Sequence, residues 1–305
     1  MNPPEITGRN LFHQFERFLL NSLARSAAGW GPLRRRKVAC FVSGFARDLL
    51  KIRWTHVVES MKLRLDLPHD RAVMLGRRFY DAFFENALEM ASIPYLSGGE
   101  LCSRVVVDGM EHLRKAHARG KGVVIVTGHY GLWEMLPPWL VHNGFRITIV
   151  VRRQKNIEVD DWFEFMRQSH GVETSDSGFS LREILRTLRK GHLLGLMSDQ
   201  DAGDKGIFVK FFGEDASTVV GPAAIAQKTG APIVTLAVHP GRPNPPHRIE
   251  ICPAIFPEDF PGDEIGRKAM TQIYTSILEN WIRKHPEHWF WLHRRWKTRP
   301  PSALT

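Results

Sequence analysis

Apolar residues recur along the chain with two different periods, and the change from one to the other falls near residue 97. Over residues 10–30, and again over about 36–91, they return every three to four positions, which is the spacing of amphipathic helices. The turn-rich residues 97–99 end this pattern. We therefore predict a helical portion over residues 38–97, preceded by an amphipathic segment over residues 1–37.

Short runs of β-branched and aliphatic residues alternate with helical stretches after residue 98. The runs occupy residues 122–127, 146–151, 193–197, 232–238 and 248–252. The helices are expected at about residues 110–118, 131–142, 159–170, 180–190, 219–229 and 264–284. Such alternation is typical of a mostly parallel sheet covered by helices. The predicted fold is α/β, with a mostly parallel central sheet flanked by helices over residues 98–300. Together with the helical portion this makes a single domain over residues 38–300.

The amino-acid composition indicates in which cellular compartment the protein functions and which class of partner it binds. The 305 residues include 42 Lys and Arg against 32 Asp and Glu, a formal net charge of +10. This excess favours an anionic partner: nucleic acid, phospholipid, a phosphorylated substrate or an acidic protein. The three cysteines are widely spaced and fit neither a disulfide framework nor a zinc site, which predicts a reducing, cytoplasmic-side location. No apolar run reaches the roughly 18 to 20 residues of a spanning helix, and no signal peptide opens the chain.

The basic excess is concentrated near the amphipathic N-terminal segment. Residues 1–70 carry 12 basic and 6 acidic side chains, and the basic run 34–37 directly follows the helix predicted over residues 10–30. One interpretation is that this helix lies in a bilayer interface, with the basic residues on anionic headgroups. The other is that it packs on the core and the charges are solvated. The sequence leaves both open.

His129 and Glu134 are the first candidates for chemistry. His129 directly follows the predicted strand 122–127, and in an open α/β sheet the junction between strand and helix is where ligands bind. Gly128 and Gly131 allow the loop to turn His129 back towards Glu134, which would fix the tautomer of the imidazole and leave its other nitrogen as a general base. No G-x-S-x-G elbow, Walker loop, H-E-x-x-H or G-x-G-x-x-G motif is present. A base without a nearby protein nucleophile predicts direct transfer to a hydroxyl of the substrate.

Four segments together resemble a known family. Residues 127–134, Thr-Gly-His-Tyr-Gly-Leu-Trp-Glu, look like the H-x4-D/E motif of the lipid A late acyltransferases, the lauroyl and myristoyl transferases to which the phosphatidylinositol mannoside acyltransferases are related. Residues 152–156 resemble the family's Arg-x3-Asn block, although its Pro after the first Arg is Arg153 here. Residues 199–231 and 291–300 are similar to its longest conserved stretch and its C-terminal signature. The resemblance covers about residues 40–300.

The resemblance implies a role for each matching residue. His129 is the expected general base and Glu134 its orienting partner. Substrate-binding residues are expected to be Arg152, Asn156, Asp199, Gln200, Arg294 and Arg295. Within that set, Arg152 would bind the acceptor phosphate or the thioester oxyanion, and Asp199 and Gln200 would line or brace the pocket. The basic C-terminal residues 294–299 are expected to form a phosphate or headgroup surface. Backbone N–H groups at the start of the helix after His129 are the other candidate oxyanion donors. No metal or cofactor is required.

The expected activity is O-acyl transfer from acyl-ACP, or from acyl-CoA, to a hydroxyl of a phosphorylated glycolipid, most simply a lipid A precursor. Members of the family commonly begin with a membrane-spanning helix, and this chain offers only the amphipathic segment. The expected location is therefore peripheral or monotopic, on the cytoplasmic face of the bacterial inner membrane. Two alternatives stay open: an acyltransferase for another membrane glycolipid, such as a phosphatidylinositol mannoside or an aminolipid, and a non-catalytic protein that binds anionic lipid. No nucleic-acid-binding signature is present, so nucleic acid is not an expected partner.

Overall fold

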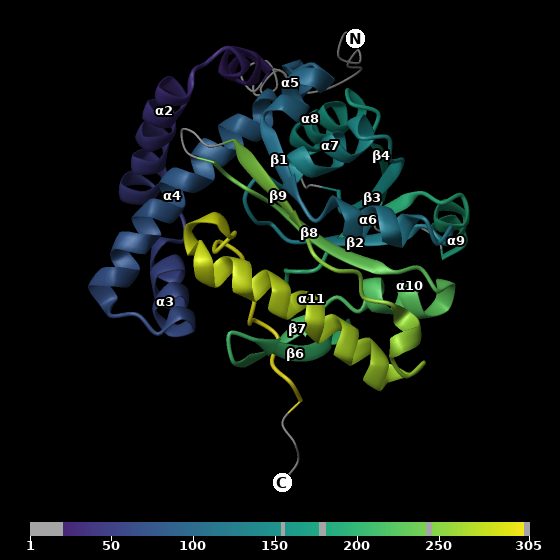
Figure 1. Ribbon diagram of the computed structural model, residues 1–305. Coiled ribbons are helices and arrows are strands. Elements are labelled where there is room, and N and C mark those ends of the chain that lie inside the picture. The colour runs from purple at the N-terminus through teal and green to yellow at the C-terminus, as the bar shows by residue number, and fades with distance from the viewer. Residues whose placement is uncertain (1–20, 154–155, 177–180, 242–245, 302–305) are drawn as a thin grey trace.

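A seven-stranded sheet forms the centre of the protein (Figure 1), in a computed structural model that describes residues 21–153, 156–176, 181–241 and 246–301. The strands follow the order β1-β9-β8-β2-β5-β3-β4. Their bounds are β1 Val105–Asp108, β2 Val123–Thr127, β3 Ile147–Val151, β4 Glu173–Asp176, β5 Leu193–Met197, β8 Ile233–His239 and β9 His247–Ile251. Neighbours pair in parallel except β8 and β9, which are antiparallel. The prediction of a mostly parallel sheet is confirmed.

Four strands were missing from the sequence-based prediction. β1 and β4 are four-residue strands at the two edges of the sheet, and β4, with the sequence Glu-Thr-Ser-Asp, contains no apolar residue. β6 (Ile207–Phe211) and β7 (Glu214–Thr218) form a separate antiparallel hairpin. A strand such as β4 carries no hydrophobic period, and β1 is too short to show one, so the pairing of these edge strands is set by tertiary contacts rather than by local pattern.

Helices cover both faces of the sheet (Figure 1). Successive side chains of a strand point to opposite faces, so the buried residues of β2 are shared between two cores. One core lies under α6 (Met110–His117), α7 (Leu136–His142) and α8 (Ile157–Gln168). The other lies under α9 (Leu181–Arg189), α10 (Gly221–Thr229) and α11 (Glu264–Lys284). The sheet is therefore the middle of three layers.

The N-terminal helices pack beside this layered body, on the left in Figure 1. They are α2 (Pro32–Gly44), a π-helical turn η1 (Phe45–Leu49), α3 (Trp54–Leu65) and α4 (His69–Ser92), followed by the short α5 (Gly98–Ser103). Five 3-10 turns complete the described elements: η2 Ile93–Tyr95, η3 Trp133–Met135, η4 Gly203–Lys205, η5 Pro257–Asp259 and η6 Pro286–His288. In the described part of the chain, no helix combines the length and the apolarity needed to cross a membrane.

The basic run 34–37 is not uniformly solvated. Arg35 is buried and forms an ion pair with the buried Glu89 of α4, which also accepts from Arg104 at 2.7 Å and lies 3.6 Å from His247. Burial alone would raise the pKa of Glu89, but the hydrogen bond from His247 and the charges of Arg35, His247 and Arg104 lower it to about 2. Arg35 therefore anchors α2 to the body. Most of the amphipathic helix predicted over residues 10–30 lies outside the described residues, and residues 21–28 are helical.

Candidate functional site

The candidate residues converge on the carboxyl edge of the central strands. His129 follows β2, Asp199 follows β5, and Arg152 follows β3. Because these three strands are parallel neighbours in the order β2-β5-β3, their carboxyl ends meet at one edge of the sheet. That edge is the usual ligand-binding position in open α/β sheets.

His129 is held by Asp199 at two points. The backbone N–H of His129 donates to Asp199 Oδ2 at 2.8 Å, and His129 Nδ1 lies 2.8 Å from Asp199 Oδ1. Gly128 makes this approach possible, because a Cβ at that position would lie 3.1 Å from Asp199 Cγ and 2.8 Å from Leu278 Cδ2. With Nδ1–H donating to the carboxylate, the lone pair of the imidazole is on Nε2.

The structure contradicts the expected pairing of His129 with Glu134. Glu134 lies in the 3-10 turn η3, and its two carboxylate oxygens accept from Arg167 Nε at 3.1 Å and Arg167 Nη2 at 2.6 Å. The carboxylate is buried, so the planar guanidinium of α8 supplies the charge and the hydrogen bonds that burial demands. Asp199 occupies the orienting position instead.

The charges around His129 favour its protonated form. Burial by itself lowers the pKa of the imidazole, but the charge and the hydrogen bond of Asp199, followed by the charge of Glu134, outweigh burial and raise the pKa above 6.5. Asp199 is 4% exposed, and burial by itself raises its pKa. The charge and hydrogen bond of His129, and the hydrogen bond of the Trp289 indole, bring the pKa of Asp199 down to about 2. Asp199 is thus a permanent carboxylate and His129 a base strengthened by it.

A C-terminal segment, residues 289–298, wraps around this pair. Trp289 Nε1 donates to Asp199 Oδ2 at 2.9 Å, and the backbone N–H of Phe290 donates to the carbonyl of His129 at 3.0 Å. His293 Nε2 accepts from the backbone N–H of Asp201 at 2.8 Å, and Thr298 Oγ1 donates to Asp201 Oδ2 at 2.8 Å. Trp289 and Phe290, just before the segment that resembles the family's C-terminal signature, therefore position the His129–Asp199 pair, and His293 and Thr298 within that segment fix the neighbouring Asp201.

This arrangement contradicts the expected phosphate surface at Arg295. Arg295 is 1% exposed, and its guanidinium hydrogen-bonds the carbonyl of Ser217 and the hydroxyl of Thr218 in β7. Burial lowers the pKa of Arg295 to about 10 against the charges of nearby carboxylates. Arg295 therefore ties the C-terminal segment to the hairpin. Arg294 beside it is exposed.

The other predicted residues occupy different positions around His129. Gln200 lies closest, with Nε2 at 3.4 Å from His129 Nε2. Arg152 is exposed, and no hydrogen bond or ion pair joins it to another described residue. Asn156 caps α8, because its Oδ1 accepts from the backbone N–H groups of Glu158 at 3.0 Å and Val159 at 3.4 Å. The side-chain oxygen of Asn156 therefore stabilises the start of α8.

The backbone N–H groups beside His129 already have acceptors. His129 donates to Asp199, Tyr130 to the carbonyl of Gly128, Gly131 to that of His288, and Leu132 to that of Val238, over distances of 2.7 to 3.3 Å. Gly131 reaches its partners through a positive φ of 61°, and a Cβ there would lie 1.9 Å from the carbonyl oxygen of Val238. The backbone donors at residues 129–132 are therefore occupied within the protein, and the expectation of backbone oxyanion donors at the start of the following helix stays a prediction for residues beyond Leu132.

An apolar cavity of about 60 Å³ lies between the sheet and helices α7 and α8. Ile125, Ile149 and Gly195 line its sheet side, and Trp133 and the Glu134–Arg167 ion pair line its other side. The ring of Trp133 also contacts His129, with 5.5 Å between centroids. Trp133 therefore links the imidazole to the cavity, whose lining includes neither His129 nor Asp199.

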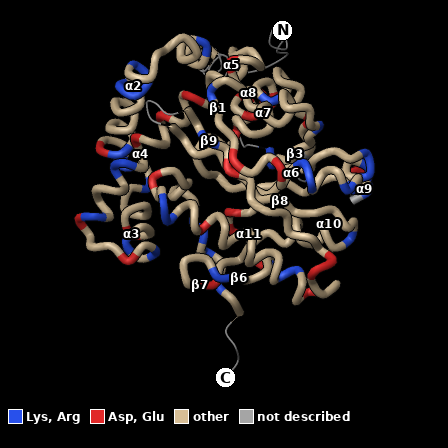
Figure 2. Tube along the Cα trace, viewed as in Figure 1, with Lys and Arg blue, Asp and Glu red and all other residues tan. Residues whose placement is uncertain are grey.

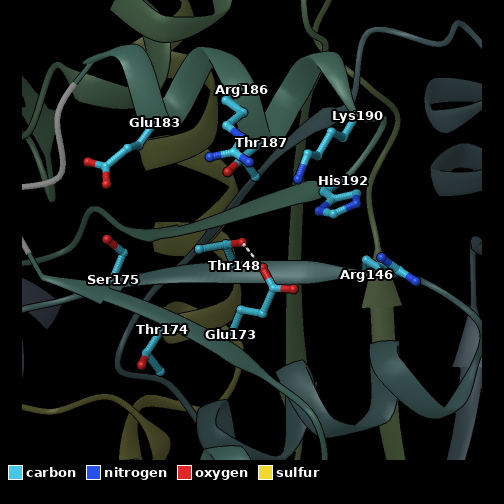
Figure 3. Close-up of a pocket in the computed structure, with 10 residues that line it drawn as sticks. All are labelled: Arg146, Thr148, Glu173, Thr174, Ser175, Glu183, Arg186, Thr187, Lys190 and His192. Atoms are coloured by element: carbon cyan, nitrogen blue, oxygen red, sulfur yellow. Dashed lines mark hydrogen bonds between the residues drawn. The ribbon is translucent and has the colours of Figure 1, made fainter.

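A larger polar cleft of about 410 Å³ lies elsewhere (Figure 3). Arg186 and Lys190 of α9 face Glu173 across it, and Arg146 and His192 stand at its end. Arg146 and His192 immediately precede β3 and β5, so this end of the cleft marks the amino ends of those strands. None of the predicted site residues lines it, which leaves the carboxyl edge as the candidate site.

Comparisons with known proteins agree with these motifs. A family model described as "Bacterial lipid A biosynthesis acyltransferase" matches residues 70–298. A phosphatidylinositol mannoside acyltransferase of Mycobacterium tuberculosis is 30% identical over 214 residues, which cover 68% of this chain and 66% of that protein. The lipid A biosynthesis palmitoleoyltransferase of Escherichia coli is 28% identical over 196 residues, which cover 64% and 62%. The chain thus spans slightly less than two thirds of the length of both relatives.

A solved structure is also similar. It is the crystal structure of the 1-acyl-sn-glycerophosphate acyltransferase PlsC from Thermotoga maritima, with a TM-score of 0.39, 18% sequence identity, and coverage of 88% of this chain and 97% of that chain.

Sequence reasoning missed Trp289 and Arg167 and gave Asp199 a lesser role. The available signal for Asp199 was its place directly after the run 193–197, which matches the place of His129 after the run 122–127. If the two strands had been known to be neighbours, the pairing of the two side chains could have been predicted. The local sequence pattern does not give the strand order. For Trp289 and Arg167, no comparable signal exists.

Titration of the His129 imidazole by NMR tests the assigned partner. Asp199→Asn removes the main source of the raised pKa, so the pKa of His129 is expected to fall clearly below the wild-type value. Glu134→Gln is the matched control, because its charge acts on His129 without a hydrogen bond, and it is expected to lower that pKa less. A larger shift in Glu134→Gln than in Asp199→Asn would contradict the assignment.

Proposed function

The chain belongs to the bacterial lipid A biosynthesis acyltransferase family, and we propose that it transfers a fatty acyl group from a thioester to a hydroxyl of a phosphorylated glycolipid. The observation that carries this proposal is the fixed imidazole of His129. Its Nδ1 is bound to Asp199, and its Nε2 lies beside Gln200 in a site with an apolar cavity. A general base, a polar donor and an apolar lining are what hydroxyl acylation by a fatty thioester requires.

The proposed step needs no protein nucleophile. The acceptor hydroxyl gives its proton to His129 Nε2 as its oxygen bonds to the thioester carbonyl carbon. The tetrahedral intermediate then breaks its C–S bond, and the leaving thiolate takes the proton from the imidazolium, which restores the neutral base. Asp199 stabilises the imidazolium throughout, and such base catalysis is typically worth about two to four powers of ten in rate.

Gln200 is the proposed donor to the oxyanion. Its amide N–H₂ lies 3.4 Å from the nitrogen that takes the proton, whereas the backbone N–H groups of residues 129–132 already have acceptors. One such donor is worth roughly 3 to 4 kcal/mol in the transition state. Glu134 acts indirectly in this scheme, by holding Arg167 and adding negative charge near the imidazole.

The apolar cavity is the proposed entrance for the acyl chain. Ile125, Ile149 and Gly195 present only hydrocarbon and backbone to it, and burial of each chain methylene there contributes about 0.8 kcal/mol. The absence of a side chain at Gly195 contributes to this space, since a Cβ would lie 2.8 Å from Ile149 Cγ2.

The proposed acceptor is a lipid A precursor and the proposed donor is acyl-ACP, with acyl-CoA as the alternative donor. The formal charge of +10 supports an acidic carrier protein and an anionic membrane surface as partners. The proposed location is peripheral, on the cytoplasmic face of the bacterial inner membrane. A phosphatidylinositol mannoside is the second candidate acceptor, supported by a relative named for that substrate.

A transfer assay tests the proposed reaction. Purified protein is incubated with acyl-ACP or acyl-CoA and with a lipid A precursor or a phosphatidylinositol mannoside, and mass spectrometry records the acylated product. Wild-type protein is expected to acylate a glycolipid, and His129→Ala is expected to lose at least about 100-fold in rate, because the general base is removed.

The acceptor that gains mass identifies the substrate. Transfer to the mannoside alone would replace lipid A as the acceptor. Transfer to neither acceptor from either donor, or an unchanged rate in His129→Ala, would refute the proposed reaction and leave anionic-lipid binding as the function.

Arg152 is proposed to bind the acceptor phosphate. It follows β3, two strands from β2, and strand spacing places it about 10 Å along the edge from His129, which suits a second group of the acceptor better than the oxyanion. Its exposed guanidinium can make two charge-assisted hydrogen bonds to phosphate, a geometry that lysine does not reproduce.

Arg152→Lys keeps the charge and removes the planar fork. We expect it to raise the acceptor KM about tenfold with a smaller effect on kcat, because the contact is made equally in the ground state and the transition state. The measurement is steady-state kinetics on phosphorylated and dephosphorylated acceptors, with Arg294→Lys as a control at an exposed arginine. An equal loss on both acceptors would show that Arg152 does not bind the phosphate.

A further inference from the structure

The outer side of α2 and η1 exposes large apolar side chains. Phe41 is 78% exposed, Leu33 69% and Leu49 67%, and Leu50 and Phe45 are 54% and 50% exposed. Ile52 continues the exposed run just after η1. We call Leu33, Phe41, Phe45, Leu49, Leu50 and Ile52 the α2 patch. Several exposed large apolar side chains on one outer helical segment are typical of an interaction surface.

The opposite side of α2 is bound to α4, and these contacts hold the α2 patch facing outwards. Arg35 pairs with Glu89, and Ser43 donates to Asp81, both on α4. Ala39, between them on the same side, is fully buried. The helix therefore packs through small and charged residues and turns its large apolar residues outwards, the reverse of a helix that packs on an apolar core.

Basic residues surround the patch. Residues 33–53 contain seven Lys or Arg and one acidic residue, Asp48, which is bound by Arg47 at 2.7 Å. Figure 2 shows Lys and Arg along α2. Arg34, Lys37 and Lys51 are exposed among the apolar side chains. Apolar side chains interspersed with cations are the pattern of a helix that lies in the interface of an anionic bilayer.

The patch is also close to the candidate site. Helix α4 separates the two: Glu89 and Asp81 hold α2, whereas Asn86 donates to the carbonyl of Gly131 at 3.4 Å and the ring of Phe83 lies 5.6 Å from that of Phe290. The Phe290 ring in turn lies 5.9 Å from His129. One helix diameter, about 10 Å, therefore separates the patch from the elements that surround the imidazole.

The geometry points to the α2 patch as the surface that inserts into an anionic phospholipid bilayer and brings the His129 site to a lipid acceptor. The second part of this inference, delivery of the site to a lipid acceptor, rests on the proposed function, since a glycolipid acceptor resides in the membrane. The first part, binding to the bilayer, is independent of acyl transfer. It also places membrane contact beyond residue 37, the end of the segment assigned to the membrane from sequence. The observations favour a bilayer over a protein partner because exposed apolar residues and exposed cations alternate along α2 and η1, and α2 lies on the outside of the molecule (Figure 1).

Vesicle sedimentation with the full chain tests the inference. Vesicles of phosphatidylglycerol and phosphatidylethanolamine are compared with vesicles of phosphatidylcholine alone, at low and high salt. The wild-type protein is expected to bind the anionic vesicles, and the double variant Phe41→Asp with Phe45→Asp is expected to bind at least about tenfold more weakly, because two rings no longer enter the bilayer and two negative charges face it. Equal binding by the wild type and this variant would overturn the inference.

Ile265→Asp is the matched control. Ile265 is 72% exposed at the start of α11, on the other side of the molecule from α2 (Figure 1), and its replacement is expected to leave vesicle binding unchanged. If the double variant melts at a lower temperature than the wild type, Leu33→Ser with Phe41→Ser provides the same comparison at the two most exposed positions of α2. A loss of binding in Ile265→Asp equal to that in the α2 variants would overturn the inference.

Two further measurements separate the other possible occupants. A wild-type dimer that the double variant dissociates, with vesicle binding unchanged, would assign the patch to a second copy of the chain and overturn the inference. Loss of binding to acyl carrier protein, with vesicle binding unchanged, would overturn it in the same way. Transfer to an acceptor dissolved in detergent is expected to continue at the wild-type rate in the double variant, so failure of the proposed reaction and failure of the membrane inference give different results.

Discussion

The contact between His129 and Asp199 is the constraint on which the rest of the site depends. It joins the carboxyl ends of two neighbouring parallel strands, β2 and β5, and requires a glycine at position 128 for the approach. A buried carboxylate needs partners on all sides, and here the imidazole, a backbone N–H and the indole of Trp289 supply them. Trp289 follows α11. The C-terminal segment therefore helps to orient the imidazole, because Trp289 fixes the carboxylate that holds it.

Two carboxylates lie near His129, and they have different roles. The H-x4-D/E motif alone would assign the orientation of His129 to Glu134. Asp199 contacts the imidazole, whereas Glu134, five residues from His129 in sequence, balances the charge of Arg167 and joins the turn after β2 to α8. Both are buried, and each has a cation or a set of donors within hydrogen-bond distance. Removing Glu134 would leave the buried Arg167 charge without its partner. Its loss is therefore expected to lower the stability of the fold more directly than the rate of the reaction.

Local pattern predicted the strands that form the centre of the sheet and the helices that cover it, because continuous aliphatic runs and helical periods reflect burial directly. It did not predict β1 or β4, which are only four residues long, or the β6–β7 hairpin, which pairs outside the main sheet. His129 and Asp199 were both recognised as site residues, but their pairing depends on strand order. Arg295 was assigned to a surface because arginine is usually exposed, and tertiary packing against β7 buried it.

A double-mutant cycle on acyl transfer tests most directly whether His129 and Asp199 form one unit. The rates of His129→Ala, Asp199→Asn, Glu134→Gln and the two combinations with His129→Ala are compared with the wild-type rate. Groups that act as a unit are non-additive, so Asp199→Asn is expected to cost little more once His129 has been removed. The account is contradicted if Asp199→Asn multiplies the loss in the His129→Ala background while Glu134→Gln adds nothing to it.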